Sequence, residues 1–364
     1  MPIGRGVLLV AVALSLAGCA GARDRIASRP VGAFDAAEIV DVLAPDTIPA
    51  VDRPVFEDPA FSAERLQPQD PVAVVEIDGD ARAYPLAILV WHEIVNDVVA
   101  GEPIAVTYAP LTGSEAAFRR TVGGRVLSFG ASGKLYRSNL VMFDRATRSL
   151  WPQLRGTAVL GPGSGQSLEP VPLRIASFGD FRAAYPAGKV LTAETGAARV
   201  YGATPYEGYE SRVAPSRAFF APRIDPRLGA MERVLGVRAG GVARAYPYTR
   251  LRAGGVVQDR IAGQDVVVLW RAGTRSPLDT PLIADARDIG SAGAFVPLVD
   301  GRRLDFVPTP GGFRDSQTAS TWSVLGIATA GPLAGKRLPP LDQADAFWFA
   351  WAGFTPSTTV FGLS

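Results

Sequence analysis

Cysteine and histidine are almost absent from this chain of 364 residues, in which Cys19 and His92 are the only members of their kinds. A single cysteine cannot close an internal disulfide, and one cysteine with one histidine cannot supply a Cys/His zinc site or an iron–sulfur cluster. Any serine or cysteine nucleophile activated by histidine would have to use His92. The sequence therefore predicts no metal site and no cofactor.

An excess of positive charge is also missing, because 37 Lys and Arg residues are offset by 35 Asp and Glu residues. A nucleic-acid binder would instead show a basic stripe or tail, so no nucleic-acid partner is expected. Hydrophobic residues make up 48% of the chain and charged residues 20%, which permits a large core and excludes global disorder. The 39 Gly and 30 Pro residues indicate a chain dense in turns.

The first nineteen residues combine a short apolar run with the single cysteine. The apolar run Gly6–Leu16 is too short to span a bilayer and is typical of a signal peptide. It leads into Leu16-Ala17-Gly18-Cys19, which resembles the lipobox, the motif whose cysteine is lipidated and becomes the mature N-terminus. We expect a signal peptide at 1–18, a tether at 19–40 and a membrane anchor through lipid on Cys19. An ordinary secretory signal is the alternative.

This signal also predicts where the protein is found. A lipid-anchored protein of this kind belongs to the bacterial cell envelope. In an organism with two membranes, Ala20 after the cysteine favours the periplasmic face of the outer membrane, by resemblance to sorted lipoproteins.

The sequence contains an internal repeat. The pentapeptide A-R-A-Y-P occurs at Ala81–Pro85 and again at Ala243–Pro247, and Asp97 is matched by Asp259 at the same spacing. Further landmarks follow in the same order, with extra residues in the second copy between about 275 and 295. We predict a first β-rich unit at 41–200, a linker at 201–231 and a second, divergent unit at 232–364. The linker is expected to pack between the units.

Turn residues between short apolar runs predict β-hairpins. The clearest hairpins are Val72–Ile77 with Ala81–Tyr84 and Val95–Val99 with Ile104–Tyr108. Helix signals are few, and the main one, over Leu86–Glu93, follows a proline. The predicted fold is mainly β, with two tandem, divergent repeats resembling small β-barrels or sandwiches and few short helices.

Polar residues gather in the word W-H-E-I-V-N-D, Trp91–Asp97. In a helix His92 and Asn96 share one face, and in a strand they also do so, opposite Glu93 and Asp97. The second unit has glycine where the first has His92, so a site would belong to the first unit. A structural histidine that locks a turn is the alternative to a functional one.

Several characteristic motifs lie along the chain: I-P-A-V-D (Ile48–Asp52), A-R-A-Y-P-L (Ala81–Leu86), W-H-E-I-V-N-D (Trp91–Asp97), V-T-Y-x-P-L-x-G (Val106–Gly113), S-G-K-L-Y-R-S-N-L-V-M-F-D-R (Ser132–Arg145), S-L-W (Ser149–Trp151) and Y-G-x-x-P-Y-x-x-Y (Tyr201–Tyr209). Together they resemble the domain-of-unknown-function family 3179, over about Asp41–Ser364. The resemblance carries no reaction to this chain.

One departure from the family pattern concerns thiol chemistry. Where that pattern usually reads T-Y-C-P-L-C-G, this chain has Ala109 and Thr112 in place of the two cysteines. A Cys-x-x-Cys pair near a histidine has the chemistry of a soft-metal site or a redox dithiol, and neither role is available to this chain. The two interpretations are that this chain is a degenerate member and that the pair is only structural in its relatives. The neighbouring Tyr108 and, in another family word, Arg137 and Asn139 complete the candidate site.

Three functions follow as hypotheses. The leading one is an envelope lipoprotein of unknown molecular function whose β units bind an envelope partner or a small ligand. The second is an enzyme, hydrolase-like or other, using His92 with Asp97 or Glu93 as acid and base. The third is a degenerate metal-handling protein that has lost its thiolates. Convergence of the candidate residues on one pocket would favour a site, and dispersal would favour structural roles.

Overall fold

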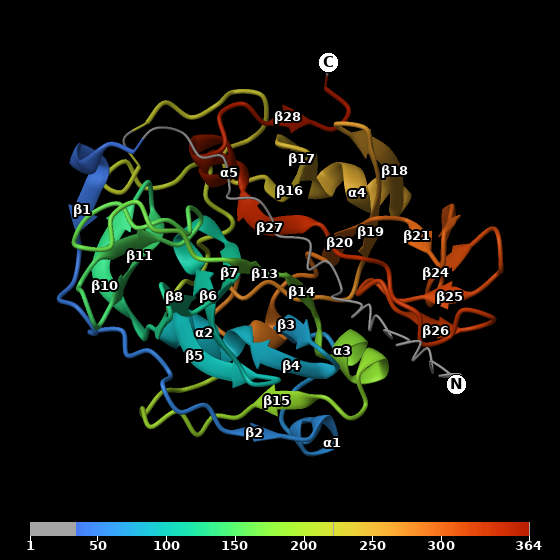
Figure 1. Cartoon of the computed structure of the whole chain (residues 1–364), viewed down its shortest axis with the longest axis horizontal. Coiled ribbons are helices and arrows are strands. Elements are labelled where there is room, and N and C mark those ends of the chain that lie inside the picture. The colour runs from blue at the N-terminus through green and yellow to red at the C-terminus, as the bar shows by residue number, and fades with distance from the viewer. Residues whose placement is uncertain (1–33, 221, 364) are drawn as a thin grey trace, which may run out of the picture.

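The computed structural model describes residues 34–220 and 222–363, which form a mainly β protein with a few short helices (Figure 1). Cys19, the predicted signal peptide and most of the predicted tether lie outside the described residues. Among the helices of the described part, none is both long and apolar enough to cross a bilayer. We refer to residues 34–200 as the N-terminal half, to 201–231 as the linker and to 232–363 as the C-terminal half.

The elements of the N-terminal half are, in chain order, η1 (Ala36–Glu38), β1 (Ile39–Asp41), β2 (Phe56–Glu57), α1 (Pro59–Ser62), β3 (Pro71–Ile77), β4 (Asp80–Pro85), α2 (Leu86–His92), β5 (Ile94–Val99), β6 (Glu102–Ala109), η2 (Pro110–Thr112), β7 (Ser114–Arg119), β8 (Thr121–Val122), β9 (Arg125–Val126), β10 (Phe129–Tyr136), β11 (Asn139–Asp144), β12 (Leu150–Pro152), β13 (Pro170–Val171), β14 (Leu173–Ser177), α3 (Phe178–Ala184) and β15 (Lys189–Leu191).

The elements of the C-terminal half are β16 (Arg233–Ala239), β17 (Val242–Pro247), α4 (Tyr248–Gly254), β18 (Val256–Ile261), β19 (Gln264–Arg271), η3 (Ile283–Asp285), β20 (Ser291–Phe295), β21 (Leu298–Val299), β22 (Arg302–Arg303), β23 (Phe306–Thr309), β24 (Gly312–Asp315), β25 (Thr321–Trp322), β26 (Ala328–Ala330), β27 (Asp342–Phe347), α5 (Trp348–Phe354) and β28 (Thr359–Val360).

Each half is built from small sheets. The N-terminal half has the strand orders β14-β3-β4-β15-β2, β13-β7-β6-β5 and β1-β10-β11-β12, and the C-terminal half has β27-β16-β17-β28, β18-β19-β20 and β23-β24-β25-β26. Two short hairpins, β8-β9 and β21-β22, complete the set. The first sheet of each half contains one parallel pair, β15 with β4 and β28 with β17. Strand β1, at the end of the predicted tether, pairs with β10.

The mainly β prediction with few short helices is confirmed, but the barrel prediction is wrong. Every sheet formed by the described residues is open, and none closes on itself. The reason lies in helix α2, which separates the hairpin β3–β4 from the hairpin β5–β6 and sends them into different sheets. Both hairpins form where the turn signals predict them. Helix α4 separates the corresponding hairpins of the C-terminal half.

Helix α2 has only seven residues and is held by packing, because a helix this short is not stable alone. Its buried apolar side chains are Leu86, Ile88, Leu89 and Val90. The backbone leaves the helix at Glu93, which adopts a left-handed conformation with φ of 58° and donates its N–H to the oxygen of Leu89 at 2.8 Å. The polypeptide chain therefore turns sharply between His92 and strand β5.

Asp97 accepts hydrogen bonds from two side chains of the A-R-A-Y-P strand in the N-terminal half. Arg82 Nη1 lies 2.7 and 2.8 Å from its two carboxylate oxygens, and the Tyr84 hydroxyl donates to Oδ2 at 2.6 Å. The Val98 N–H also donates to Oδ1 at 2.7 Å. Asp97 is buried, and these contacts tie β4 to β5 across the helix between them.

The C-terminal half makes the same contacts with the matching residues. Arg244 Nη1 lies 2.6 Å from Asp259 Oδ2, and the Tyr246 hydroxyl donates to that oxygen at 2.7 Å. Burial tends to raise the pKa of Asp259, but these hydrogen bonds outweigh it and hold the pKa below its usual range. In both halves the pentapeptide supplies an arginine and a tyrosine to one aspartate.

Two tryptophans at matching positions are core residues. Trp151 and Trp322 are fully buried, and each donates its indole N–H to an aspartate seven residues earlier, Asp144 at 3.1 Å and Asp315 at 2.9 Å. These indoles are therefore packed and hydrogen-bonded inside their halves, away from solvent.

Candidate functional site

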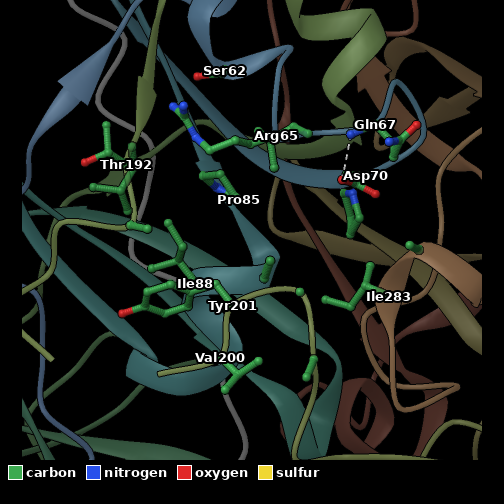
Figure 2. Close-up of a pocket in the computed structure, with 18 of the residues that line it drawn as sticks. Ser62, Arg65, Gln67, Asp70, Pro85, Ile88, Thr192, Val200, Tyr201 and Ile283 are labelled. Atoms are coloured by element: carbon green, nitrogen blue, oxygen red, sulfur yellow. Dashed lines mark hydrogen bonds between the residues drawn. The ribbon is translucent and has the colours of Figure 1, made fainter. Parts of the chain in front are cut away.

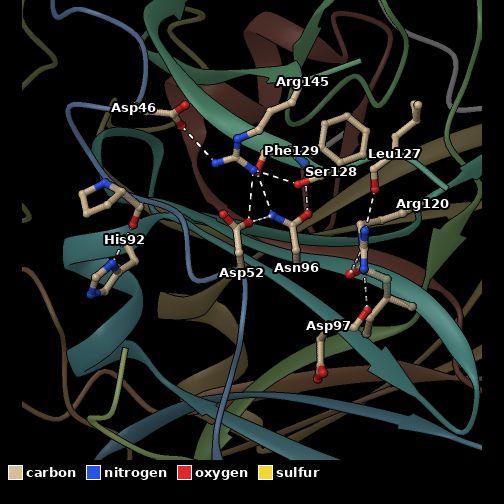
Figure 3. A network of polar contacts seen from close by, with 12 residues as sticks. Asp46, Asp52, His92, Asn96, Asp97, Arg120, Leu127, Ser128, Phe129 and Arg145 are labelled. Atoms are coloured by element: carbon tan, nitrogen blue, oxygen red, sulfur yellow. Dashed lines mark hydrogen bonds and ion pairs between the residues drawn. The ribbon is translucent and has the colours of Figure 1, made fainter. Parts of the chain in front are cut away.

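The residues predicted as a site lie in several separate surroundings. Figure 3 shows His92 at the end of α2 and Asp97 on β5 with their side chains directed away from each other. Among the described residues there is no group of three His, Cys, Asp or Glu side chains placed to share a metal ion. The geometry thus supports neither an acid–base pair of His92 with Asp97 nor a weak metal site made with Glu93.

His92 is buried with both ring nitrogens engaged. Nδ1 lies 2.6 Å from the oxygen of Pro49, which can only accept, so Nδ1 carries the proton. Nε2 lies 2.7 Å from the Tyr201 hydroxyl and accepts its hydrogen. The Tyr201 oxygen is in turn 2.5 Å from the hydroxyl of Thr195. Burial, more than any other cause, lowers the pKa of His92, which agrees with a neutral ring.

Asn96 fastens the strand β5 to β10. Its side-chain amide donates to the oxygen of Phe129 at 2.8 Å and to Asp52 at 2.7 Å, and its oxygen accepts the Phe129 N–H at 3.0 Å. Arg145 closes this network by contacting both Asp52 and the Phe129 oxygen (Figure 3). Because every polar atom of the Asn96 amide is used, its role here is structural.

Glu93 is the residue of the predicted set whose environment is most unusual. Its side chain is 9% exposed and lies against Tyr206. Burial raises the pKa of its carboxyl from 4.5 to about 7, although a hydrogen bond with Tyr206 opposes the shift. No described residue forms an ion pair with it, so the ionised form of the carboxyl has no counter-charge among the described residues.

Besides the burial of its carboxyl, the backbone conformation of Glu93 is also unfavourable in free energy. A left-handed φ is uncommon for residues other than glycine and costs of order 1 kcal/mol or more. At the position that matches Glu93 in the C-terminal half stands Gly255, which has φ of 70° and no such cost. The N-terminal half therefore keeps a strained, buried acid where the fold accepts glycine.

Tyr108 belongs to a buried polar cluster at the contact between the two halves. It pairs in register with Glu115 on β7, and its hydroxyl has no hydrogen-bond partner among the described residues. Burial is the main cause that raises the pKa of Tyr108, so the hydroxyl stays protonated. Arg233, whose charge opposes that rise, sits close by at the start of β16.

The same cluster holds three acids around one arginine. Glu210 accepts from Arg233 at 3.1 and 3.2 Å, and Asp345 accepts from the Tyr248 hydroxyl at 2.7 Å. Burial raises the pKa of Glu115 well above its usual range and that of Asp345 to about 6. With Asp345 N–H donating to Glu115 at 2.7 Å, the cluster joins β7 of one half to β27 of the other.

Asn139 and Thr112 meet in a second buried network. The Asn139 amide donates to the Thr112 hydroxyl at 3.0 Å and to Gln153 at 2.8 Å, and Ser114 lies 2.8 Å from the same hydroxyl. Ala109 is also buried, and its oxygen accepts from Thr112 at 3.2 Å. At the two positions where the family pattern has cysteine, this chain thus has a packed methyl and a satisfied hydroxyl.

Arg137 lies apart from these groups, in the turn between β10 and β11. It forms an ion pair with Glu38 of η1 and donates to the oxygen of Gly353 in α5. These contacts fasten the beginning of the described chain and one helix of the C-terminal half to the turn, so Arg137 has a structural role.

The linker contacts each of three consecutive residues, Trp91, His92 and Glu93. The Trp91 indole donates to the oxygen of Ala203 at 2.9 Å, His92 accepts from Tyr201 and Glu93 contacts Tyr206. The three consecutive residues at the end of α2 thus each hold one part of the linker.

Two cavities lie next to the contacts between the linker and the end of α2. The larger, which we call the linker cavity, has a volume of about 520 Å³. Figure 2 shows polar Arg65, Gln67 and Asp70 on one side of it and apolar Ile88, Val200 and Ile283 on the other. Tyr201 forms part of its wall, with the hydroxyl turned to His92. Leu282, Ile283 and Ala284, from the stretch predicted as extra residues in the second unit, also line the cavity.

The smaller cavity, which we call the Glu93 cavity, has a volume of about 260 Å³. Its walls are largely apolar: Val42, Leu43, Ile48, Leu111, Ala131, Gly133, Leu135, Leu140 and Phe219. Glu93, Tyr206 and Lys134 supply its polar groups. Lys134 is in an ion pair with Asp41.

A family model described as "Protein of unknown function (DUF3179)" matches residues 45–358. The chain belongs to the DUF3179 family. No match was found to a curated protein or to a solved structure. This match confirms the family resemblance of the sequence motifs.

Several residues that surround the candidate site are not predicted from the sequence. Tyr201 and Tyr206 lie in a family word, but nothing in that word indicates that they contact His92 and Glu93. Glu210, Arg233 and Asp345 come from three separate segments that meet only in the fold. A usable signal was Gly255, at the sequence position that matches Glu93, because glycine favours a left-handed turn.

Proposed function

We propose that this DUF3179 protein is a lipid-anchored protein of the bacterial cell envelope that binds a small amphipathic ligand in the linker cavity. The observation that carries the proposal is the composition of this cavity, with a polar side and an apolar side and walls from both halves and the linker. Its volume lies within the range of small-molecule sites. The enzymatic alternative has less support, because both nitrogens of His92 are engaged with Pro49 and Tyr201.

The roles of the walls follow from their chemistry. Ile88, Val200 and Ile283 would cover the apolar part of the ligand, and Arg65 with Asp70 would hydrogen-bond its polar part. His92 acts through Tyr201: the neutral imidazole fixes the hydroxyl and with it the linker segment that forms the wall. His92 is a positioning residue in this proposal.

We also infer that the two halves are divergent copies of one unit. The matching strand orders β14-β3-β4-β15 and β27-β16-β17-β28 support this, as do the matching contacts of Asp97 and Asp259. If so, the two copies contribute different parts: the first supplies Trp91, His92 and Glu93, and the second supplies the extra segment that lines the linker cavity.

Filling the linker cavity should abolish ligand binding. Ala284 lines the cavity from the C-terminal half and is exposed, so Ala284→Trp adds bulk without disturbing the core. Titration with the amphipathic probe 1-anilinonaphthalene-8-sulfonate, followed by fluorescence, is expected to show at least about tenfold weaker binding than for the unaltered protein.

The matched control is Val126→Trp, at a position 58% exposed in the β8–β9 hairpin. It adds the same side chain outside the cavity and should leave probe binding unchanged. Equal binding by the Ala284→Trp and Val126→Trp variants would show that the linker cavity is not the site.

Membrane anchoring has its own test. Cys19→Ser removes the thiol that would be acylated, and the protein is expected to move from the membrane fraction to the soluble fraction of fractionated cells. Cys19 is the only cysteine, so no other thiol replaces it. Retention of the Cys19→Ser variant in membranes would contradict the lipoprotein assignment and leave the linker-cavity proposal untouched.

A further inference from the structure

The Glu93 cavity combines features that the proposed function does not use. It holds a carboxyl among apolar walls, at a residue with a strained backbone, and no described cation pairs with it. A buried carboxylate without a counter-charge is costly, and strain at a residue other than glycine adds to the cost. Gly255 at the matching position removes both costs in the C-terminal half, so the fold itself does not require them.

The polar groups around the carboxyl limit what it can bind. Among the described residues, Tyr206 is the one hydrogen-bond partner that lowers the pKa of Glu93. Most of the acceptor sites of the carboxylate are therefore unused. The remaining charged group in the walls, Lys134, is paired with Asp41. A ligand that brings a positive charge and hydrogen-bond donors to this point would satisfy the carboxylate, and an apolar body would suit the walls.

We propose that the Glu93 cavity is a second binding site, which takes a small primary alkylammonium ion. The ammonium donates to the Glu93 carboxylate, and the alkyl chain packs against side chains such as Leu111, Leu135 and Leu140. The Tyr206 hydroxyl remains hydrogen-bonded to the carboxylate and holds it in place. This site is distinct from the linker cavity, with which it shares no lining residue.

Calorimetric titration of the full chain tests the site with probes of matched shape. The n-butyl- and n-hexylammonium ions are compared with n-butanol and n-hexanol, which have the same chains and no charge. At about pH 8 the ammonium ions are expected to bind at least about tenfold more tightly than the alcohols. At about pH 5.5 binding of the ammonium ions should weaken, because protonation of Glu93 removes its charge.

Glu93→Gln is nearly isosteric and keeps the fold, and it should reduce ammonium affinity at least about tenfold while leaving the alcohols unaffected. Lys134→Met is the control for the other charge in the walls and should not weaken ammonium binding. The proposal is overturned if the unaltered protein binds no ammonium ion, if alcohols bind as tightly, or if Glu93→Gln binds the ammonium ions with unchanged affinity.

Discussion

Replacing Arg233 with methionine is expected to lower the free energy of unfolding by about 3–5 kcal/mol, the cost of breaking a buried ion pair by removing one partner. Arg233 is 8% exposed and is paired with Glu210. Without the guanidinium, Glu210 keeps a buried carboxylate whose only other described partner is the hydroxyl of Ser276. Urea denaturation at neutral pH, followed by tryptophan fluorescence, measures the loss.

Two variants separate this effect from ordinary surface electrostatics. Arg119→Met removes an arginine that also pairs with two glutamates, Glu102 and Glu169, but in a partly exposed position, and should cost less than about 1 kcal/mol. Adding Glu210→Gln to Arg233→Met should restore part of the lost stability, because the uncompensated charge is then gone. A loss for Arg233→Met no larger than that for Arg119→Met would contradict the role given to the cluster.

Stability is expected to fall as the pH rises from about 4.5 to about 7. The pKa of Glu93 is 4.5 when the chain is unfolded and about 7 when it is folded, so the folded state binds more protons in this range and loses stability as they dissociate. This pKa difference corresponds to about 3 kcal/mol at pH 8. Asp345, with a pKa of about 6, contributes in the same direction.

Glu93→Gln isolates the share of one residue. At about pH 8 this variant should be more stable than the unaltered protein by about 3 kcal/mol, and near pH 4 the two should be equal. Chemical denaturation at both values measures the difference, and the exposed Glu64→Gln serves as the control that leaves the slope unchanged. A Glu93→Gln variant that is destabilised at pH 8 would mean that the carboxylate is held by a counter-charge.

Local signals in the sequence predict much of the fold. Turn residues place the hairpin between Ile77 and Asp80, and the apolar run after Pro85 places helix α2, because both features depend on neighbouring residues alone. The matched spacing of A-R-A-Y-P and Asp97 also has a physical cause, since the arginine and tyrosine of the pentapeptide bind that aspartate.

What the sequence does not predict depends on contacts between distant segments. The partners of His92 are Pro49 and Tyr201, which lie 43 and 109 residues away. Barrel closure was a wrong prediction because strand patterns do not specify which sheet a hairpin joins, and α2 decides this by turning the chain at Glu93. The cavities likewise depend on how the linker lies on α2.

The strand order of the first sheet has a consequence for the order of assembly. Strands β3 and β4 are made early, but β14 and β15, which pair with their two free edges, follow roughly a hundred residues later in the chain. Until those strands arrive, the hairpin exposes unpaired N–H and C=O groups on both sides and can join the edges of other chains. The N-terminal half therefore becomes a closed folding unit only after Leu191 is in place, and its early segments depend on the late ones for protection against aggregation.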